Sequence, residues 1–271
     1  MGYENLDYKN FAQTKRDINV SYLGNVAHST KLSHSLERIN MSTYGIYLAS
    51  SNSSGYSVCG NDAACREFCL SQSGHAMMDI LNNNARGVVS GRSRKVKLFF
   101  ENRSYFMQWM IAEITKYKLL AELEGSQFSV RLNCTSDLDL SLFMFEGKNI
   151  CDIFPTVQFY DYTKCYNYLD NTKKYANYYM VYSYNGFNWG LCEKALKNGY
   201  NAAVVFKNHL PRTYRGYRVI NGDEYDYRPY DDSNVIVGLK FKMVASAIKD
   251  KKFTIPKIPF IVDTDDVNCA W

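Results

Sequence analysis

The sequence lacks the features that mark several large classes of protein. No stretch approaches the roughly 18 consecutive apolar residues of a membrane-spanning helix, so we expect no membrane partner. The first ten residues contain no apolar core of the kind found in a secretory signal, which predicts a cytoplasmic chain with reduced thiols. There is no phosphate-loop sequence, no G-x-G-x-x-G and no G-x-S-x-G. Nucleoside-triphosphatase, dinucleotide-binding and serine-hydrolase functions are therefore disfavoured.

Histidine is scarce, and neither sign of charge is in large excess. The four histidines form no H-x-H and no HExxH pattern. The net charge of +5 is compatible with anionic partners without requiring them. The charge is uneven, because residues 86–97 are basic without a single acid and residues 223–232 are rich in aspartate. Apolar residues make up 46% of the chain, so a sizeable core is expected.

After residue 40, short β-branched or aromatic runs alternate with polar clusters and helical stretches. Strands are predicted at 45–49, 96–100, 128–132, 156–160, 178–183, 202–206, 217–220 and 235–239. Helices are predicted at 71–85, 104–123, 139–150, 164–176 and 187–198.

Strands separated by helices indicate parallel βαβ units. We therefore predict an α/β fold, a (β/α)8-like or partial parallel barrel, with an open sheet as the alternative. The barrel would be a single domain over residues 41–245. An irregular N-terminal extension (1–40) would precede it, and a C-terminal tail (246–271) would follow.

Three of the eight cysteines, Cys59, Cys65 and Cys69, lie close together with the spacing C-x5-C-x3-C. In a chain with reduced thiols, clustered cysteines favour a metal over disulfides. An iron–sulfur cluster with three cysteine ligands leaves one iron open to a small molecule. Radical S-adenosylmethionine enzymes use such a triplet on the loop after the first strand of a barrel. Their usual spacing is C-x3-C-x2-C, so this chain departs from it.

Two other interpretations of the triplet remain open. A structural zinc ion closes its site with four ligands, so His75, Cys134 or another residue would have to complete it. The three cysteines can also be unrelated free thiols. The sequence does not decide among the three interpretations.

Polar side chains follow the predicted strands, where a parallel barrel gathers its functional groups. The candidates for binding a substrate or cofactor are Arg131, Asn133, Ser136, Asp137, Ser183, Asn185, Asp226 and Arg228. The candidates for catalysis are Asp161, Lys164 and Asp223. Arg131 and Lys164 suit a carboxylate or phosphate group, and the two aspartates suit a general base or a contact to an amine. The simpler explanation is that loops after strands are polar in any protein.

Several motifs occur in one order along residues 40–245. They are Cys-Leu-x-x-x-Gly at 69–74, Arg-Leu-Asn at 131–133, Phe-Tyr-Asp-Tyr-Thr-Lys at 159–164, Ala-Val-Val-Phe at 203–206 and Val-Gly-Leu-Lys at 237–240. In this order they resemble the gene product eighty-eight family of phage- and plasmid-encoded proteins. One departure is Gly60, at a position where proline follows the first cysteine in that family. The resemblance implies an origin in a phage or mobile element and a single domain, and it implies no reaction.

These observations lead to one main functional hypothesis and two alternatives. The main hypothesis is a phage-type, radical-S-adenosylmethionine-like enzyme that carries a [4Fe–4S] cluster and acts on a small polar or nucleotide-type substrate in the host cytoplasm. The first alternative is a nucleic-acid-binding protein of phage replication or host takeover, suggested by the basic stretch and the 23 tyrosines. The second is a zinc-stabilised binding protein.

Overall fold

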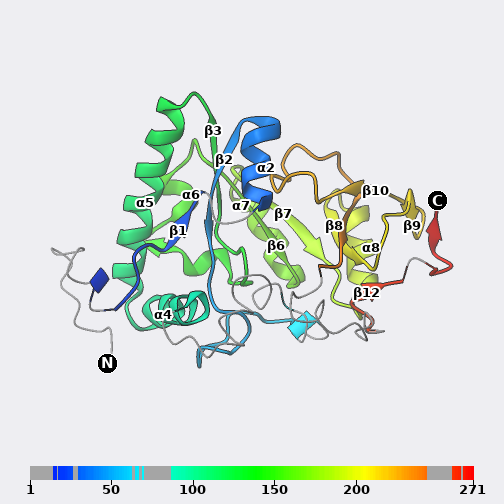
Figure 1. Cartoon of the computed structure of the whole chain (residues 1–271), viewed down its shortest axis with the longest axis horizontal. Helices are drawn as coiled ribbons and strands as arrows, with labels where there is room; N and C mark the ends of the chain where they lie inside the picture. The colour runs from blue at the N-terminus through cyan, green and yellow to red at the C-terminus, as the bar shows by residue number, and fades with distance from the viewer. Residues whose placement is uncertain are drawn as a thin grey trace.

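The computed structural model describes residues 15–16, 18–26, 30–62, 65–66, 69, 87–242, 258–263 and 265–271. Within them, the strands form one eleven-stranded sheet in the order β1-β2-β3-β6-β7-β8-β11-β10-β9-β13, with β12 beside β8 (Figure 1). Its strands are β1 (Gly24–Asn25), β2 (Met41–Ile46), β3 (Gln127–Arg131), β6 (Gln158–Thr163), β7 (Tyr178–Ser183), β8 (Asn201–Phe206), β9 (Thr213–Tyr214), β10 (Tyr217–Asn221), β11 (Ile236–Lys240), β12 (Ile261–Val262) and β13 (Cys269–Ala270). A separate hairpin consists of β4 (Met144–Phe145) and β5 (Lys148–Asn149).

The described helices are α2 (Thr30–Ile39), α4 (Val88–Glu101), α5 (Arg103–Leu123), α6 (Ile150–Ile153), α7 (Asn171–Lys174) and α8 (Trp189–Lys197). Two 3-10 turns lie between them, η3 (Leu140–Leu142) and η4 (Tyr166–Asp170). None of these helices, including the 21-residue α5, is apolar over a stretch long enough to cross a membrane.

The central strands follow one another in chain order. β2, β3, β6, β7 and β8 are neighbours in that order, and each pair is parallel. Crossovers between neighbouring parallel strands are right-handed. When each new strand is added on the same side of the previous one, the connecting helices therefore all lie on one face of the sheet. The carboxyl ends of all these strands consequently meet at one edge.

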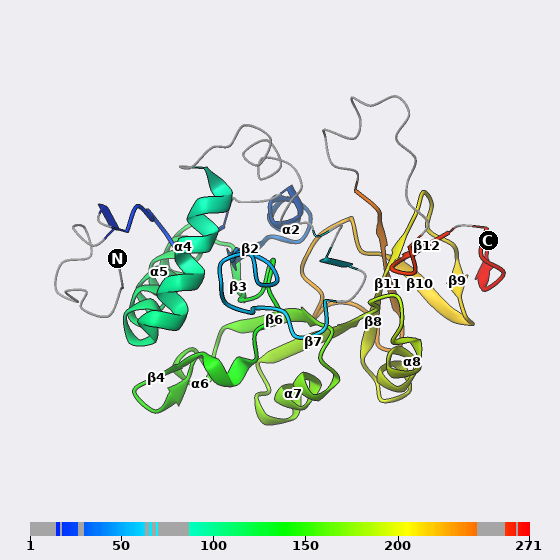
Figure 2. The same ribbon diagram turned by 90° about the horizontal axis from the view of Figure 1, so that it is seen from below.

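The strands bend in an arc, with α6, α7 and α8 along its outer side and α2 across its inner side (Figure 2). The outer side carries the main core, where Phe159, Met180 and Val204 join Trp109 and Met110 of α5. The alternate residues of the strands face inward in smaller clusters.

The fold is thus mixed α/β with a large, mostly parallel sheet. Antiparallel strands end it on both sides, β1 beside β2 and β9 beside β10. Among the described strands the two ends of the sheet do not pair, so no closed barrel is observed, and the (β/α)8-like form of the prediction is not confirmed.

Helix α5 agrees with the sequence prediction for 104–123 because both its caps are encoded locally. The Asn102 side chain accepts a hydrogen bond from Tyr105 N at 3.1 Å, and Gly125 follows the helix with a left-handed φ of +69°. Glu113 of this helix is buried, and its carboxylate accepts hydrogen bonds from Gly24 N at 3.0 Å and from Tyr44 Oη at 2.7 Å. This contact attaches the segment before α2 to the helix.

Two predictions of secondary structure are wrong, and a third cannot be compared. The stretch 96–100 is not a strand but the last part of α4, whose buried face includes Lys95, Val96, Leu98 and Phe99, so its apolar run follows a helical period. The helix predicted at 139–150 is mostly η3 and the β4–β5 hairpin, which turns at Glu146 and Gly147, both with positive φ. The helix predicted at 71–85 lies outside the described residues.

Candidate metal centre at the carboxyl edge of the sheet

The loop that carries the cysteines leaves β2 and runs along the carboxyl edge. Val58 N donates to Ser51 O at 2.9 Å, which closes the first part of the loop on itself. Asp137 N then donates to Val58 O at 2.8 Å, and Cys59 forms an isolated parallel bridge with Asp137. The first cysteine is therefore held beside the loop that follows β3.

The same loop is also attached to the end of β6. Asn61 Nδ2 donates to Lys164 O at 3.2 Å, and Lys164 N donates to Asp137 Oδ2 at 2.8 Å. A Cβ atom on Gly60 would lie only 3.1 Å from the Cys165 sulfur, so glycine permits this close approach. Three loops, after β2, β3 and β6, therefore meet at the cysteines.

A local turn positions Cys65. Asp62 O accepts hydrogen bonds from Cys65 N at 2.9 Å and from Arg66 N at 3.1 Å. The Asp62 carboxylate accepts two bonds from the Arg66 guanidinium, each at 2.8 Å, and one from Ser51 Oγ. The bonds from Arg66 hold the pKa of Asp62 below its usual value, so the turn keeps its anchor at neutral pH.

The positive charge at the centre of this arrangement belongs to Lys164, a half-buried side chain. Burial by itself lowers the pKa of Lys164. The negative charges of its neighbours have the larger combined effect, so the pKa of Lys164 lies above its ordinary value; these neighbours are Cys65, Asp137, Cys59 and Cys69. Burial raises the pKa of Cys59 to about 12 and also raises that of Cys65, while the charge of Lys164 acts in the opposite direction on both. All three thiols therefore lie within electrostatic reach of one ammonium group.

The three thiols interact with the same lysine, but in their described positions they do not form a metal site. In the part of the chain that the structure describes, no three His, Cys, Asp or Glu side chains are arranged to hold a metal ion. Cys134, a suggested fourth ligand for zinc, has Arg131, Asp226 and Asp161 as its main electrostatic partners. His75 lies outside the described residues. The three thiols therefore interact electrostatically with Lys164, but their described positions do not form a metal site.

Three predicted site residues, Asp161, Asn133 and Ser136, form a buried network next to the cysteines. Asp161 Oδ1 accepts from Asn133 N at 2.8 Å, and Asp161 Oδ2 accepts from Tyr178 Oη at 3.0 Å. The Asn133 Oδ1 atom accepts from Ser136 Oγ at 2.8 Å and from Leu138 N at 2.9 Å. These bonds fix the loop after β3, which in turn carries Asp137.

Asp161 makes the stability of this loop dependent on pH. Burial raises its pKa to about 7, against the lowering effects of the Arg131 charge and the hydrogen bonds from Asn133. Because the unfolded carboxyl has a pKa of about 3.9, the folded state holds this proton more tightly. The contribution to stability is therefore full below about pH 4 and is lost as the pH rises to about 7.

We expect wild-type protein to lose a few kcal/mol of unfolding free energy relative to Asp161→Asn between about pH 4 and pH 7. Urea unfolding of both proteins across this range measures the difference directly. A difference that stays constant with pH would contradict the assignment of a neutral Asp161.

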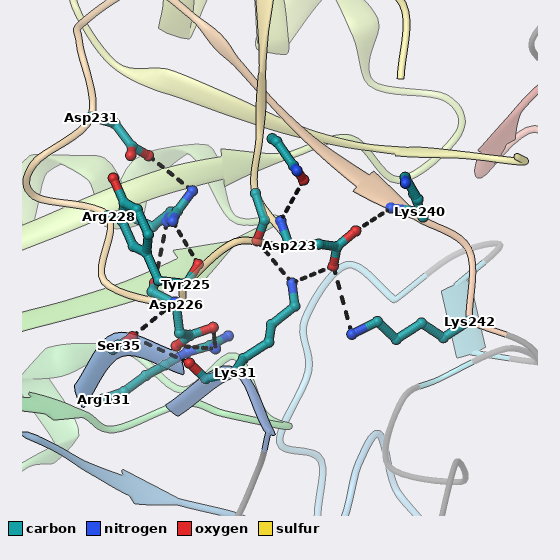
Figure 3. A network of polar contacts seen from close by, with 12 residues as sticks. Lys31, Ser35, Arg131, Asp223, Tyr225, Asp226, Arg228, Asp231, Lys240 and Lys242 are labelled. Carbon is teal, nitrogen blue, oxygen red and sulfur yellow. Dashed lines mark hydrogen bonds and ion pairs between the residues drawn. The ribbon is translucent and has the colours of Figure 1, made fainter. Parts of the chain in front are cut away.

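A second group of predicted residues lies on the inner face of the sheet (Figure 3). The Arg131 Nη1 atom lies 2.8 Å from both carboxylate oxygens of Asp226, and Tyr160 Oη donates to the same carboxylate at 2.8 Å. Asp226 N donates to Ser35 Oγ of α2 at 2.9 Å. The Arg131 guanidinium also lies 4.7 Å from the centre of the Tyr162 ring. The segment between β10 and β11 is thereby joined to α2, β3 and β6.

The same segment takes part in three further ion pairs. Arg228 is 1% exposed, pairs with Asp231 at 3.2 Å and donates to Tyr225 O at 2.6 Å. Asp223 pairs with Lys31 of α2 at 3.0 Å and lies 3.6 Å from Lys242. These cations are engaged by carboxylates of the same chain, so the group holds α2 against the sheet.

The structure thus divides the predicted site residues among separate places. Lys164 and Asp137 lie with the three cysteines, while Arg131, Asp223, Asp226 and Arg228 belong to the network of Figure 3. Ser183 ends β7 and Asn185 lies in the turn after it, where Asn188 donates to Ser183 O at 3.0 Å and accepts from Asn185 N at 2.8 Å.

Sequence reasoning missed Asn61 and Asp62, which hold the cysteine loop, although asparagine and aspartate after a glycine are typical turn residues. It also missed Arg92 of α4. The Arg92 guanidinium lies 5.3 Å from the centre of the Tyr47 ring, and its charge reaches both Cys69 and Cys134. Arg92 lies in the basic stretch of residues 86–97, but nothing local in that stretch indicates its position near the cysteines.

A protein-family model described as Gene product 88 matches residues 11–257. No curated protein and no solved structure matches the chain. The family match covers strands β1 to β11, the cysteine loop and the network of Figure 3, in agreement with the motifs along residues 40–245. The chain belongs to the Gene product 88 family.

Proposed function

We propose that this protein is an iron–sulfur enzyme in which Cys59, Cys65 and Cys69 hold a [4Fe–4S] cluster at the carboxyl edge of the sheet. The observation that carries the proposal is that the C-x5-C-x3-C loop lies at the carboxyl edge of the sheet, attached to the loops after β3 and β6. Thiolates are the ligands that hold iron–sulfur clusters, and three of them leave one iron open. S-adenosylmethionine is the small molecule we propose for that position.

The arrangement of the strands supports the same proposal. Parallel strands in chain order, bent in an arc with helices outside, support the partial barrel that we propose, and the first of these strands precedes the cysteine loop. Substrates of parallel barrels bind at the carboxyl ends of the strands. We propose that a small polar or nucleotide-type substrate binds at this edge.

The residues of the chain would bind and orient the substrate, and the cluster would supply the chemistry. A cluster that binds S-adenosylmethionine supplies one-electron chemistry, and the barrel positions the substrate. Lys164 and Arg92 place positive charge beside the thiols, which favours a cluster with three thiolate ligands because such a cluster carries net negative charge. Cys134 and Asp161 face other partners, so neither is assigned to the cluster.

Structural zinc fits the described residues less well. A closed zinc site needs four ligands, and the carboxylates among the main electrostatic partners of the thiols are Asp62, which Arg66 and Ser51 already engage, and Asp137. Asp137 Oδ2 already accepts the Lys164 backbone N–H. The donor set therefore favours an open site over a closed one.

The nucleic-acid alternative loses part of its motivation. Within the basic stretch, Lys95 is buried and donates to Leu23 O at 2.8 Å, and Arg94 donates to Asn19 O at 3.1 Å. These two charges are used inside the chain and do not form an open basic surface for phosphates.

Anaerobic reconstitution of the full chain with ferrous iron and sulfide tests the proposal. We expect uptake of iron and sulfide in equal amounts at the [4Fe–4S] stoichiometry, with the broad visible absorption of thiolate-bound iron. Cys269→Ser is a matched control because this half-buried cysteine lies in β13, away from the loop. Protein that binds zinc but neither iron nor sulfide would contradict the proposal.

A further inference from the structure

The network of Figure 3 contains two largely buried arginines that use their guanidinium groups differently. Arg228 uses all three nitrogen atoms: Nε donates to Asp226 O at 3.2 Å, Nη2 donates to Tyr225 O at 2.6 Å, and Nη1 lies 3.2 Å from Asp231 Oδ2. Arg131 uses only Nη1, which lies 2.8 Å from both carboxylate oxygens of Asp226. Its Nε atom is buried and, in the part of the chain that the structure describes, has no hydrogen-bond partner.

The Nε atom of an arginine and the neighbouring Nη2 atom form one edge of the planar guanidinium group. The N–H groups on this edge point the same way, and the pair matches two oxygens of a carboxylate or a phosphate. In Arg131, Nη1 alone makes the contact to Asp226, so this edge takes no part in the ion pair. Leaving a buried N–H without an acceptor costs free energy, and such a group in a native structure calls for an explanation. The unused edge indicates an acceptor that does not belong to the described chain.

The orientation of the Arg131 guanidinium is fixed by groups that do not cover this edge. Tyr160 Oη donates to Asp226 Oδ2 at 2.8 Å, and Asp226 N donates to Ser35 Oγ at 2.9 Å, so the carboxylate that holds Nη1 is itself held. The guanidinium carbon lies 4.7 Å from the centre of the Tyr162 ring, which restricts the plane of the group. A binding group that is already oriented loses little conformational entropy when a ligand arrives.

The ion pairs of this network leave one positive charge without a carboxylate of its own. Asp223 is shared by two lysines, whereas each arginine has one aspartate. The cations are Lys31, Arg131, Arg228 and Lys242, and the carboxylates are Asp223, Asp226 and Asp231. Four cations against three carboxylates give an excess of one positive charge, which one bound anion would balance.

We propose that the Nε–Nη2 edge of Arg131 binds an oxyanion of a small molecule, either a carboxylate or a phosphate group. Arg131 is the last residue of β3, so its backbone lies at the carboxyl edge where we propose that the substrate binds. The inference deepens the proposed function, because it gives that substrate a negatively charged group. It rests on the proposed function only in identifying the anion as part of a substrate, since binding of the anion requires no cluster.

The test follows the arginine Nε–H signals of the full chain by nuclear magnetic resonance, after labelling with 15N-arginine. Inorganic phosphate or acetate is added at constant ionic strength, with chloride as the third arm. The signal of Arg131 is the one missing from Arg131→Lys. We expect it to shift saturably with phosphate, acetate or both, and we expect the Arg228 signal to stay in place because its Nε already donates to Asp226 O.

Line broadening of 31P in phosphate and of 13C-labelled acetate measures the affinity of each variant. Arg131→Lys keeps the charge beside Asp226 but removes the two-nitrogen edge, so we expect it to weaken binding at least about tenfold. Lys242→Met is the control: it removes a half-exposed charge of the same network and keeps the edge, so binding should change by less than about threefold. Weaker binding by Lys242→Met than by Arg131→Lys would show that net charge alone attracts the anion, and would overturn the inference.

The anion that shifts the Arg131 signal identifies the bound group as a carboxylate or a phosphate. An Arg131 signal that responds to neither anion, or that responds equally to chloride, would overturn the inference and leave the proposed cluster standing. A wild type that shows the shift but takes up no iron and sulfide would contradict the proposed function alone. If Arg131→Lys does not fold, sequential assignment of the wild-type signals identifies Arg131, and the same criteria apply.

Discussion

Serine in place of Cys59, Cys65 or Cys69 is expected to abolish the uptake of a complete [4Fe–4S] cluster. The oxygen of serine is a poor ligand for a cluster that thiolates hold, and two remaining cysteines do not fix its position. Each of the three single variants should fall to less than about a tenth of the iron and sulfide bound by wild type, because even the loss of a residue that only supports a metal ligand typically costs about 10–100-fold in affinity.

Two measurements make this result specific. Circular dichroism and thermal unfolding should show folded protein in each variant, because none of the three cysteines is among the buried core residues. Cys269→Ser, treated in parallel, should bind as much iron as wild type. Full uptake by all three single variants would show that the triplet does not hold the cluster.

The second large effect concerns the ion pair between Arg131 and Asp226. The Asp226 side chain is 3% exposed, and that of Arg131 is 16% exposed. Removing one partner leaves the other charge buried and unpaired, which costs about 3–5 kcal/mol of unfolding free energy. We expect Arg131→Met to lose that amount in urea unfolding.

Two comparisons show whether the loss of stability comes from this buried ion pair or would follow from the removal of any charged side chain. Lys173→Met removes a partner from the pair with Asp170, in which both side chains are 71% exposed, and should change stability by less than about 1 kcal/mol. The double variant Arg131→Met with Asp226→Asn should lose less than the sum of the two single changes, since neither charge is then left alone. Additive losses would indicate that the two side chains do not stabilise each other.

The best-predicted helices and strands are those whose own local sequence indicates their structure. β3, β7 and β8 are short apolar runs with clear ends, and α5 has a helical apolar face between two caps. Helix α4 was misread because Lys95, directly before its Val-Lys-Leu-Phe-Phe run, is buried and donates to Leu23 O. That partner lies 72 residues away along the chain, so no local pattern indicates it.

The candidate site was predicted in part for a similar reason. Asp161 was placed in a loop because the strand was expected to end at residue 160, whereas β6 continues to Thr163 and turns Asp161 towards Tyr178. Asp226 bonds to Ser35 across 191 residues, a contact that only the folded sheet creates. The grouping of the three cysteines was visible in their spacing, but the lysine between them required the register of β6 beside β3.

The position of iron in the folded protein tests the central claim most directly. Crystals of anaerobically reconstituted protein, measured at the iron absorption edge, give an anomalous difference map that locates every iron atom. We predict one compact peak bounded by the sulfur atoms of Cys59, Cys65 and Cys69, with the Lys164 ammonium beside it. Iron bound elsewhere, for instance at Asp223 and Asp226, or no iron at these three sulfur atoms, would contradict the account.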